Sequence, residues 1–268
     1  MIKEINVDTI EIVKEFVFDQ PKDNCGRYRG YFLYRGLPDT SFKLKTSLQR
    51  NCGELSSSLE EKLLNNFIKY TAIDSANDDD NIWRSMILGQ HHGLPTRLLD
   101  WTHSPLVGLH FAVSDSNFDS IDKNDCVVWR IDTSNLHELL PEPFQNAMKE
   151  KDVVTKVFSV EMLKKVTNSL KDYDDYVKNE SMVVIEPPSI DPRIVNQYSF
   201  FSVVPNGITD IEAFLKDNEK IEATKYVINK NLKWRIRDFL DEANISERTI
   251  YPGLDGICKW LARHYYVK

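Results

Sequence analysis

The chain has 268 residues, a length that fits one large domain or one domain with an appendage. Hydrophobic residues make up 41% and charged residues 28% of it, an ordinary globular balance that allows a sizeable core without disulfide bonds. The formal net charge of −7 argues against nucleic acid as a broad-surface ligand.

Cysteine usage and hydropathy indicate a cytoplasmic protein. The four cysteines are scattered, with no CxxC pair and no metal-ligand spacing, so we expect reduced thiols and no metal site. The first residues lack the apolar region of a signal peptide. No apolar run approaches the roughly 18 residues that span a bilayer, so we expect no contact with a membrane.

In the first half of the chain, apolar spacing and turn residues predict helices before and after one aromatic strand. An acidic run at residues 78–80 is expected to be a solvated loop. The expected elements are helices over 7–18, from 56 onward and over 82–88, a strand over 28–36 and a semi-extended segment over 42–50.

The second half of the chain alternates apolar strands with helical segments. Residues 105–113 are expected to be a buried helix or strand, and the final helix is expected to turn Ile257, Trp260 and Leu261 inward. Strands are expected over 125–132, 181–186, 198–204 and 225–228, and helices over 161–170, 191–197, 232–243 and from 254 to about 266.

These elements predict an α+β fold with one domain. A central mixed or antiparallel sheet is expected to be flanked by helices. We divide the chain into an N-terminal helix with lead-in at residues 1–25 and the main domain at residues 26–268.

Residues 89–102 are the densest group of reactive side chains in the sequence. Two glycines and a proline indicate a turned backbone there, and an apolar run follows. Such a polar segment leading into a buried element is typical of a site on a rigid scaffold. The candidate site residues from this stretch are Gln90, His91, His92, Thr96, Arg97 and Asp100.

Four segments together resemble the FRG domain, a family named for its Phe/Tyr-Arg-Gly motif. They are Tyr34–Gly36, residues 48–50, residues 90–102, and residues 193–197 with the phenylalanines at 200 and 201. The resemblance runs in order from about residue 26 to the C-terminal helix. One departure is Tyr198-Ser199-Phe200, where the family often has a glycine near the phenylalanine. The resemblance implies a place in bacterial phage defence or toxin-type conflict.

The Tyr34-Arg35-Gly36 motif at a strand end also resembles, over three residues, the first motif of ADP-ribosyltransferases. There an arginine grips a phosphate of NAD, which implies a similar fold and makes NAD a candidate substrate. Glu186, after a strand, is the nearest candidate for the catalytic glutamate of such transferases.

The residue types themselves favour an anionic ligand. A guanidinium group offers two parallel donors to a phosphate or carboxylate, so Arg35 and Arg97 are candidate anion ligands, with Arg193 as a secondary one. Both primary candidates have a structural alternative, which is pairing with Asp100. Gly36 beside Arg35 would let a ligand approach the backbone.

His91, His92 and Gln197 are the candidate catalytic residues. One histidine is expected to move a proton or to donate a hydrogen bond, and the glutamine to position a ribose hydroxyl or a water. The alternatives are histidines bonded to carbonyl groups in a tight turn and a glutamine that caps a loop. Neighbouring side chains diverge, so the two histidines seldom share a metal.

The sequence therefore predicts a pocket for a phosphate-bearing nucleotide, with no covalently bound cofactor. If it is an enzyme, the reaction would be glycosidic transfer or cleavage on NAD or a related nucleotide. The alternative is a non-catalytic module that senses a ligand and signals to a protein partner. The absence of P-loop, GxSxG, HExxH and GxGxxG patterns argues against other common enzyme classes.

Overall fold

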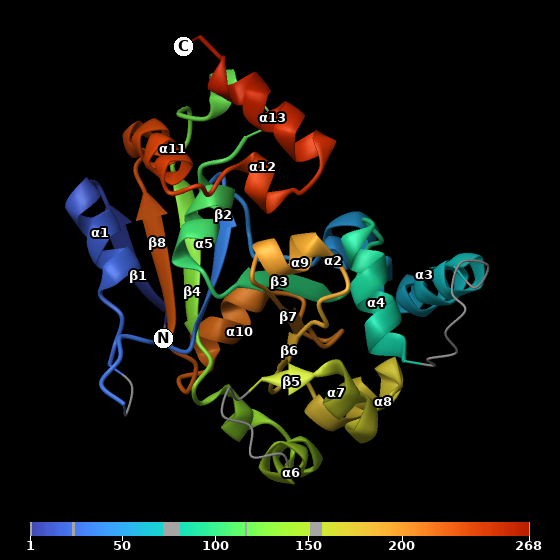
Figure 1. The fold of residues 1–268 in the computed structure, drawn as a ribbon. Coiled ribbons are helices and arrows are strands. Elements are labelled where there is room, and N and C mark those ends of the chain that lie inside the picture. The colour runs from blue at the N-terminus through green and yellow to red at the C-terminus, as the bar shows by residue number, and fades with distance from the viewer. Residues whose placement is uncertain (1, 23–24, 72–80, 116, 151–156, 268) are drawn as a thin grey trace.

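The computed structural model describes residues 2–22, 25–71, 81–115, 117–150 and 157–267. The acidic run at residues 78–80 lies outside this part of the chain. Within it, eight strands form one sheet in the order β1-β8-β4-β2-β3-β7-β6-β5 (Figure 1). The strands are β1 Ile2–Val7, β2 Phe32–Leu37, β3 Leu98–Thr102, β4 Cys126–Asp132, β5 Phe158–Ser159, β6 Val183–Glu186, β7 Ser199–Val203 and β8 Ala223–Ile228.

The sheet is mixed, and helices cover it. The β1–β8 and β5–β6 pairs are parallel and the other pairs are antiparallel, which confirms the predicted α+β class. The helices are α1 Ile10–Phe18, α2 Ser47–Cys52, α3 Ser56–Thr71, α4 Ile82–His91, α5 Pro105–Ala112, α6 Glu142–Glu150, α7 Val160–Val166, α8 Leu170–Val177, α9 Pro192–Asn196, α10 Ile211–Asp217, α11 Lys233–Glu242, α12 Glu247–Ile250 and α13 Leu254–His264.

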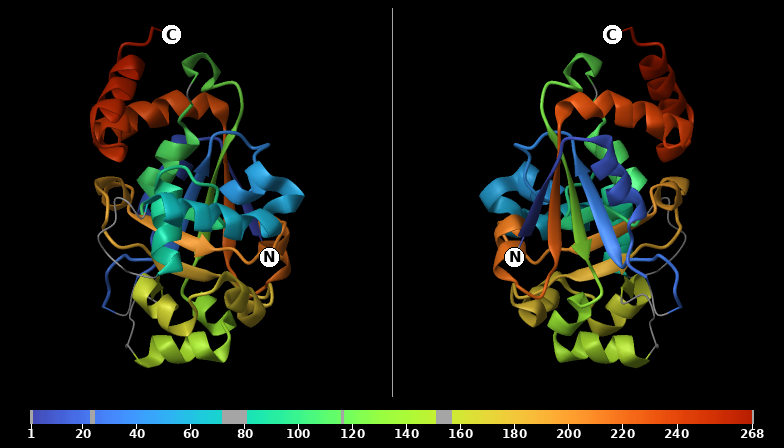
Figure 2. Two further views of the ribbon diagram at one scale, coloured as in Figure 1. Left: turned by 90° about the vertical axis from the view of Figure 1, so that its right-hand side faces the viewer. Right: turned by 90° about the vertical axis from the view of Figure 1, so that its left-hand side faces the viewer.

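The sheet consists of two halves that meet at β2 and β3. The right-hand view of Figure 2 shows β1, β8, β4 and β2 side by side, and in Figure 1 β3 runs across the end of this half. β2 pairs with β4 at six successive positions but with β3 only where Tyr34 faces Thr102. The backbone ladder is therefore nearly interrupted between β2 and β3, and we call this junction the seam.

Three apolar clusters hold the helices on the sheet. One joins β2, β3 and β4 to α10 around Trp129 and Trp101. A second joins β6 and β7 to α4, α6, α7 and α8 around Trp83 and Tyr173. The third packs α1, α5 and α11 on the other face of the first half, around Tyr34. Residues 2–18, expected as a lead-in, supply β1 and α1 to the same sheet and core.

Gly36 allows α5 to pack directly on β2. A Cβ atom at this position would overlap the carbonyl oxygen of Gly108 and the amide nitrogen of Ala112. The same contact is also tight at Gly108 on α5. A Cβ atom added to Gly108 would lie 3.0 Å from the Cβ of Tyr34 on β2. On this face of β2 a helix, not a ligand, occupies the space that a side chain at position 36 would take.

Several local predictions were wrong for identifiable reasons. The segment expected to be semi-extended contains α2, which begins with a capping box between Thr46 and Gln49. The region around Arg97 and Asp100, where a turned backbone was expected, contains strand β3. In α13, Ile257 and Leu261 are 41% and 39% exposed rather than inward, because the helix packs through Gly256 and Arg263 instead.

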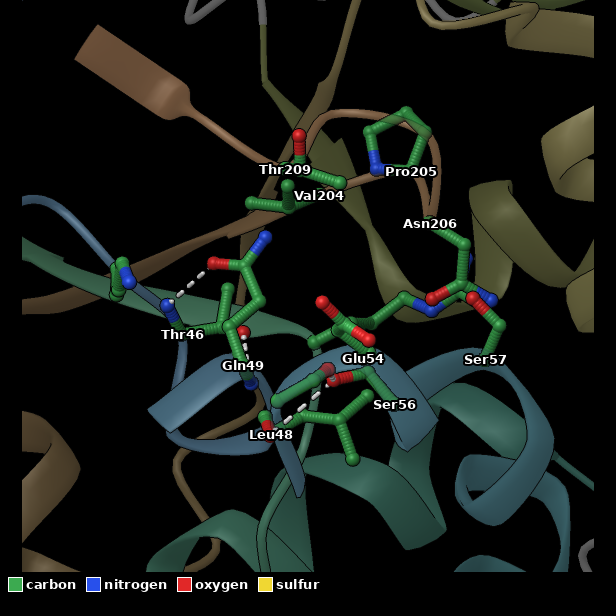
Figure 3. Close-up of a pocket in the computed structure, with 13 residues that line it drawn as sticks. Thr46, Leu48, Gln49, Glu54, Ser56, Ser57, Val204, Pro205, Asn206 and Thr209 are labelled. Atoms are coloured by element: carbon green, nitrogen blue, oxygen red, sulfur yellow. Dashed lines mark hydrogen bonds between the residues drawn. The ribbon is translucent and has the colours of Figure 1, made fainter. Parts of the chain in front are cut away.

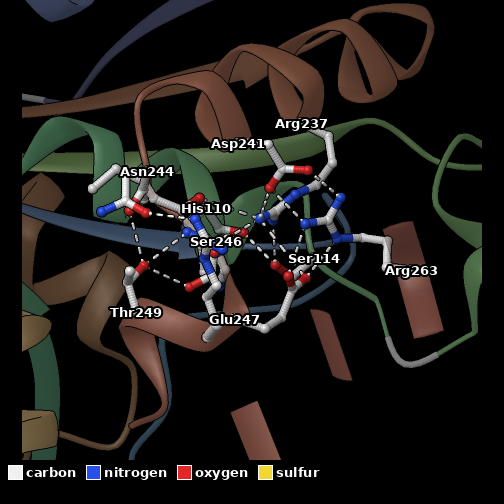
Figure 4. Close-up of polar contacts among 11 residues, drawn as sticks. His110, Ser114, Arg237, Asp241, Asn244, Ser246, Glu247, Thr249 and Arg263 are labelled. Carbon is white, nitrogen blue, oxygen red and sulfur yellow. Dashed lines mark hydrogen bonds and ion pairs between the residues drawn. The ribbon is translucent and has the colours of Figure 1, made fainter. Parts of the chain in front are cut away.

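A buried ionic network fixes the C-terminal helices (Figure 4). Arg263 donates to Glu247 through Nε at 2.8 Å and to Asp241 through Nη2 at 2.6 Å, which joins α13 to α12 and α11. Arg237, fully buried, lies 3.7 Å from Glu247 and donates to Nδ1 of His110 on α5 at 2.9 Å. The network thus connects α5 with the last three helices.

The His110 side chain should make stability depend on acid pH. Burial, with a contribution from the charge of Arg237, lowers the pKa of His110 to about 3. In the unfolded chain this histidine has its ordinary pKa of 6.5. Below pH 6.5 the unfolded chain therefore binds a proton at His110 that the folded protein does not bind. The free energy of unfolding is therefore largest above pH 6.5 and decreases on acidification. His110 alone should account for a decrease of about 2 kcal/mol between pH 6.5 and 5. Urea unfolding of His110→Gln across this range should show a shallower pH dependence than the native chain.

A matched control for this experiment is His264→Gln, which removes an exposed imidazole on α13. Its pH profile should follow that of the native chain. An unchanged slope in His110→Gln would show that His110 is not the residue responsible.

Candidate functional site

A hollow of about 190 Å³ lies at the seam, next to the near-interruption of the backbone ladder. We call it the seam hollow. Strands β2 and β3 supply its floor, α5 one wall and α9 another. The lining residues that matter for its chemistry are Arg35, Gly36, Asp100, Phe111, Arg193 and Gln197.

Arg35 bridges the two halves of the sheet. Its Nη1 donates to the backbone carbonyl of Asp100 at 2.7 Å and lies 3.4 Å from the carboxylate of the same residue. The pairing with Asp100 that was the structural alternative is therefore present. The side chain takes the place of backbone hydrogen bonds that β2 and β3 do not make here.

The guanidinium group of Arg35 is only partly satisfied. Both of its hydrogen bonds use Nη1, and its Nε is buried without a partner among the described residues. Burial lowers the pKa of Arg35, because the carboxylate of Asp100 offsets the loss of water only in part. A buried donor without an acceptor is costly, so the Nε–Nη2 edge has the character of a binding edge for an anion.

A second guanidinium group approaches from α9. Arg193 lines the seam hollow and lies over the ring of Tyr251, 4.9 Å from its centroid. No ion pair of Arg193 is found among the described residues. Helix α9 begins with Pro192 after Asp191, whose side chain accepts from the Arg193 amide at 2.6 Å and caps the helix.

Gln197 follows directly after α9 and also lines the seam hollow. The side-chain Nε2 of Gln197 donates to the backbone carbonyl of Ile250 at 3.2 Å. The backbone carbonyl of Gln197 accepts from the Thr102 hydroxyl at 2.7 Å. These bonds hold the end of α9 between β3 and α12. The loop-supporting alternative is therefore observed for Gln197, in a position that also faces the hollow.

A network of polar side chains from Gln90, Thr96 and Ser47 holds the carboxylate of Asp100. Gln90 donates to its carboxylate at 3.0 Å, and the Gln90 side-chain oxygen accepts from the Thr96 hydroxyl at 2.6 Å and from the Ser47 hydroxyl at 3.3 Å. Thr96 is buried and also accepts from the Leu98 amide. Gln90 and Thr96 therefore orient Asp100 from outside the hollow, which is a supporting role rather than the predicted ligand contact.

Arg97 lies elsewhere and is completely neutralised. It makes two hydrogen bonds to Glu60 on α3, at 2.7 and 2.5 Å, and two to Asp174 on α8, at 2.7 and 3.2 Å. Burial alone would lower the pKa of Arg97, but these two carboxylates outweigh it and raise the pKa above its ordinary value. The predicted pairing with Asp100 is wrong, because along a strand Arg97 points to a different region.

Another hollow, of about 270 Å³, lies beside Arg97 between the start of α2 and the segment after β7 (Figure 3). Several of the polar groups along it are already paired. The Gln49 side chain accepts from the Thr46 amide at 3.0 Å and donates to the Ile208 carbonyl at 2.8 Å, and Asn206 donates to Glu60. We therefore assign it no ligand.

The two adjacent histidines do not line the seam hollow. His91 Nε2 lies 3.2 Å from the carboxylate of Asp191, the residue that caps α9. His92 is exposed and meets His91 edge to face at 5.1 Å. Their predicted acid–base role gains no support from this placement. The geometry gives His91 a supporting contact to the helix that carries Arg193.

The structure therefore brings together six of the predicted residues, namely Tyr34, Arg35, Gly36, Asp100, Arg193 and Gln197. Sequence reasoning missed Tyr251, which it treated as part of a turn. The Tyr251 ring underlies Arg193, and burial raises its pKa, with the charge of Asp100 acting in the same direction. No spacing or motif marks this tyrosine, because its role depends on α12 packing against α9.

Glu186, the candidate transferase glutamate, does not reach this site. It is exposed at the end of β6, which is separated from β3 by β7. Asp100 is the one carboxylate among the lining residues of the seam hollow. Among the described residues, no group of three histidine, cysteine or acidic side chains is placed to hold a metal ion.

Residues 30–120 match the family model described as the FRG domain. This range runs from just before β2 to the segment after α5, so it includes Arg35, Gly36 and Asp100 but neither Arg193 nor Gln197. No curated protein and no solved structure matches the chain. No helix in the described part of the chain has the length and apolar character to cross a membrane.

Proposed function

We propose that the seam hollow binds the phosphate of a small-molecule nucleotide, on the premise that residues 30–120 match the model of the FRG domain. The observation that carries the proposal is the Nε–Nη2 edge of Arg35, which lacks an acceptor beside a hollow that Arg193 also lines. A phosphate oxygen pair matches the fork of a guanidinium group. NAD is the candidate substrate or ligand.

The comparison of the partly exposed Arg35 with the buried Arg97 supports this proposal. Arg97 meets two carboxylates and makes four hydrogen bonds, so the fold itself neutralises its charge. Arg35 meets a carbonyl and the distant oxygen of one half-exposed carboxylate. The positive charge of Arg35 is therefore only partly compensated. Together with the charge of Arg193 it favours an anionic ligand at the seam.

Arg35→Lys should weaken pyrophosphate binding about 10- to 100-fold with little change in stability. Lysine keeps the charge and one donor for the Asp100 carbonyl, but it loses the paired donors that are worth roughly 1.5–3 kcal/mol to a charged acceptor. Isothermal titration calorimetry with pyrophosphate and with NAD measures the affinity, and thermal unfolding checks the fold.

Arg235→Lys is the matched control, because Arg235 is exposed on α11, away from the seam. It should bind as the native chain does. Absence of pyrophosphate and NAD binding by the native chain, or equal affinity in Arg35→Lys, would overturn the proposal.

The same site would serve either an enzyme or a sensor. We place it in an effector of bacterial phage defence or toxin-type conflict, which the FRG resemblance alone supports. Nicotinamide release from NAD would identify glycosidic cleavage. The alternative, a non-catalytic module with a protein partner, is favoured by the lack of a glutamate among the lining residues. A ligand that binds and is recovered unchanged would identify that module.

A further inference from the structure

A second hollow, of about 480 Å³, borders the seam hollow. Tyr34 lines both. The two hollows are also lined by neighbouring residues of the same two segments. These are Thr102 at the end of β3 with His103 after it, and Gln197 with Tyr198 after α9. They are therefore adjacent compartments with a common wall.

Aromatic rings dominate the second hollow, which we call the aromatic hollow. Tyr28, Phe32, Tyr34, His103 and Tyr198 all line it. Tyr28 and Tyr198 are 65% and 52% exposed, so neither ring is buried in the core, although Lys22 Nζ lies over the Tyr28 ring at 5.0 Å. Several aromatic side chains gathered around one hollow are typical of a site that binds a planar ring of a ligand.

Tyr198 is held in an unusual conformation. Its φ of +48° is in the left-handed region, which a non-glycine residue adopts at a cost. Its carbonyl accepts from the His103 amide at 3.1 Å, and the His103 ring meets the Tyr198 ring edge to face at 5.1 Å. The surrounding contacts thus keep a large exposed aromatic side chain in a strained position at the rim of the aromatic hollow.

His103 adds a hydrogen-bonding group to the aromatic hollow. Its Nδ1 lies 2.9 Å from the Phe32 carbonyl, an acceptor, so Nδ1 carries the proton. In the neutral ring Nε2 is then an acceptor, and no partner of it is found among the described residues. The lining residues carry one charge, on Arg29, and no carboxylate. This combination suits a neutral ring with an N–H donor rather than a cation.

We propose that the aromatic hollow is the base-binding subsite of the same ligand site, so that one nucleotide spans both hollows. This inference rests on the proposed function, because it places the ring of the ligand next to the phosphate that Arg35 holds. Helix α5 runs between the two compartments, with Pro105 at the aromatic hollow and Phe111 at the seam hollow. Six helical residues separate these positions by roughly 9 Å.

The matched probes are AMP and ribose 5-phosphate, which differ by the base alone. We expect the native chain to bind AMP about tenfold more tightly, because stacking of a base on an aromatic side chain is favourable. Tyr198→Asn removes the ring with the residue that best tolerates positive φ. It should abolish the preference for AMP and leave the affinity for ribose 5-phosphate unchanged.

Two further variants complete the calorimetric experiment. Tyr198→Phe keeps the ring and should keep the preference, and Tyr265→Asn removes a tyrosine that is 75% exposed beyond α13 and should have no effect. Equal binding of the two probes by the native chain would overturn the base subsite and leave the phosphate site standing. So would a preference that survives in the double variant Tyr198→Asn, His103→Ala. Binding of neither probe would overturn the phosphate site and the subsite with it.

Discussion

Replacing Arg97 with methionine should lower the free energy of unfolding by about 3–5 kcal/mol. The guanidinium group neutralises both Glu60 and Asp174, and Glu60 is 3% exposed. Removing one partner of a buried ion pair leaves an uncompensated charge that water cannot reach, and this costs far more than the pair itself contributes. Urea unfolding monitored by tryptophan fluorescence, with Trp83 in the neighbouring cluster, measures the loss.

The control for this experiment is Arg235→Met, the same change at an exposed position of α11. It should change stability by less than about 0.5 kcal/mol. The triple variant Arg97→Met, Glu60→Leu, Asp174→Asn should recover part of the loss, because no unpaired buried carboxylate remains. Native-like stability of Arg97→Met alone would contradict the structural role and return Arg97 to the candidate ligands.

Gly36→Ala should destabilise the protein by about 3 kcal/mol. The added methyl group would overlap backbone atoms of Gly108 and Ala112, which cannot move aside as a flexible side chain can. Helix α5 would have to shift away from β2, and packing in the cluster around Tyr34 would be lost with it. The shift of the urea midpoint at unchanged m-value measures the effect.

Gly108→Ala provides the matched control on the other side of the same contact. Its Cβ would meet the Tyr34 Cβ at 3.0 Å, a smaller conflict, and alanine in place of glycine stabilises a helix by about 1 kcal/mol. The two effects should nearly cancel. Equal stability losses in Gly36→Ala and Gly108→Ala would contradict the geometry described for this interface.

Element types were largely predictable, because apolar periodicity reports burial directly. The strand over 125–132 and the helices beginning at 56 and 82 were predicted and are found as β4, α3 and α4. β3 was missed because glycine and proline before it indicated a turn and its five residues gave no clear period. β1 was missed because its neighbour in the sheet, β8, lies more than 200 residues further along the chain.

The site was predictable in its residue types and only partly in its arrangement. Arg35 and Asp100 stood out because of the motifs around them, and they do meet. Arg97 stood out equally, but its partners Glu60 and Asp174 come from helices whose position no local pattern reveals. The approach of Arg193 over Tyr251 likewise depends on how α9 and α12 pack.

The single paired position between β2 and β3 has a mechanical consequence. Within each half of the sheet, backbone hydrogen bonds connect neighbouring strands continuously. Across the seam the connection consists mainly of side-chain contacts, among them the hydrogen bond from Arg35 to the Asp100 carbonyl. The sheet is therefore held together at this junction by side-chain packing and by Arg35 more than by backbone hydrogen bonds, and a ligand bound at the free edge of Arg35, as proposed, would lie between the two halves.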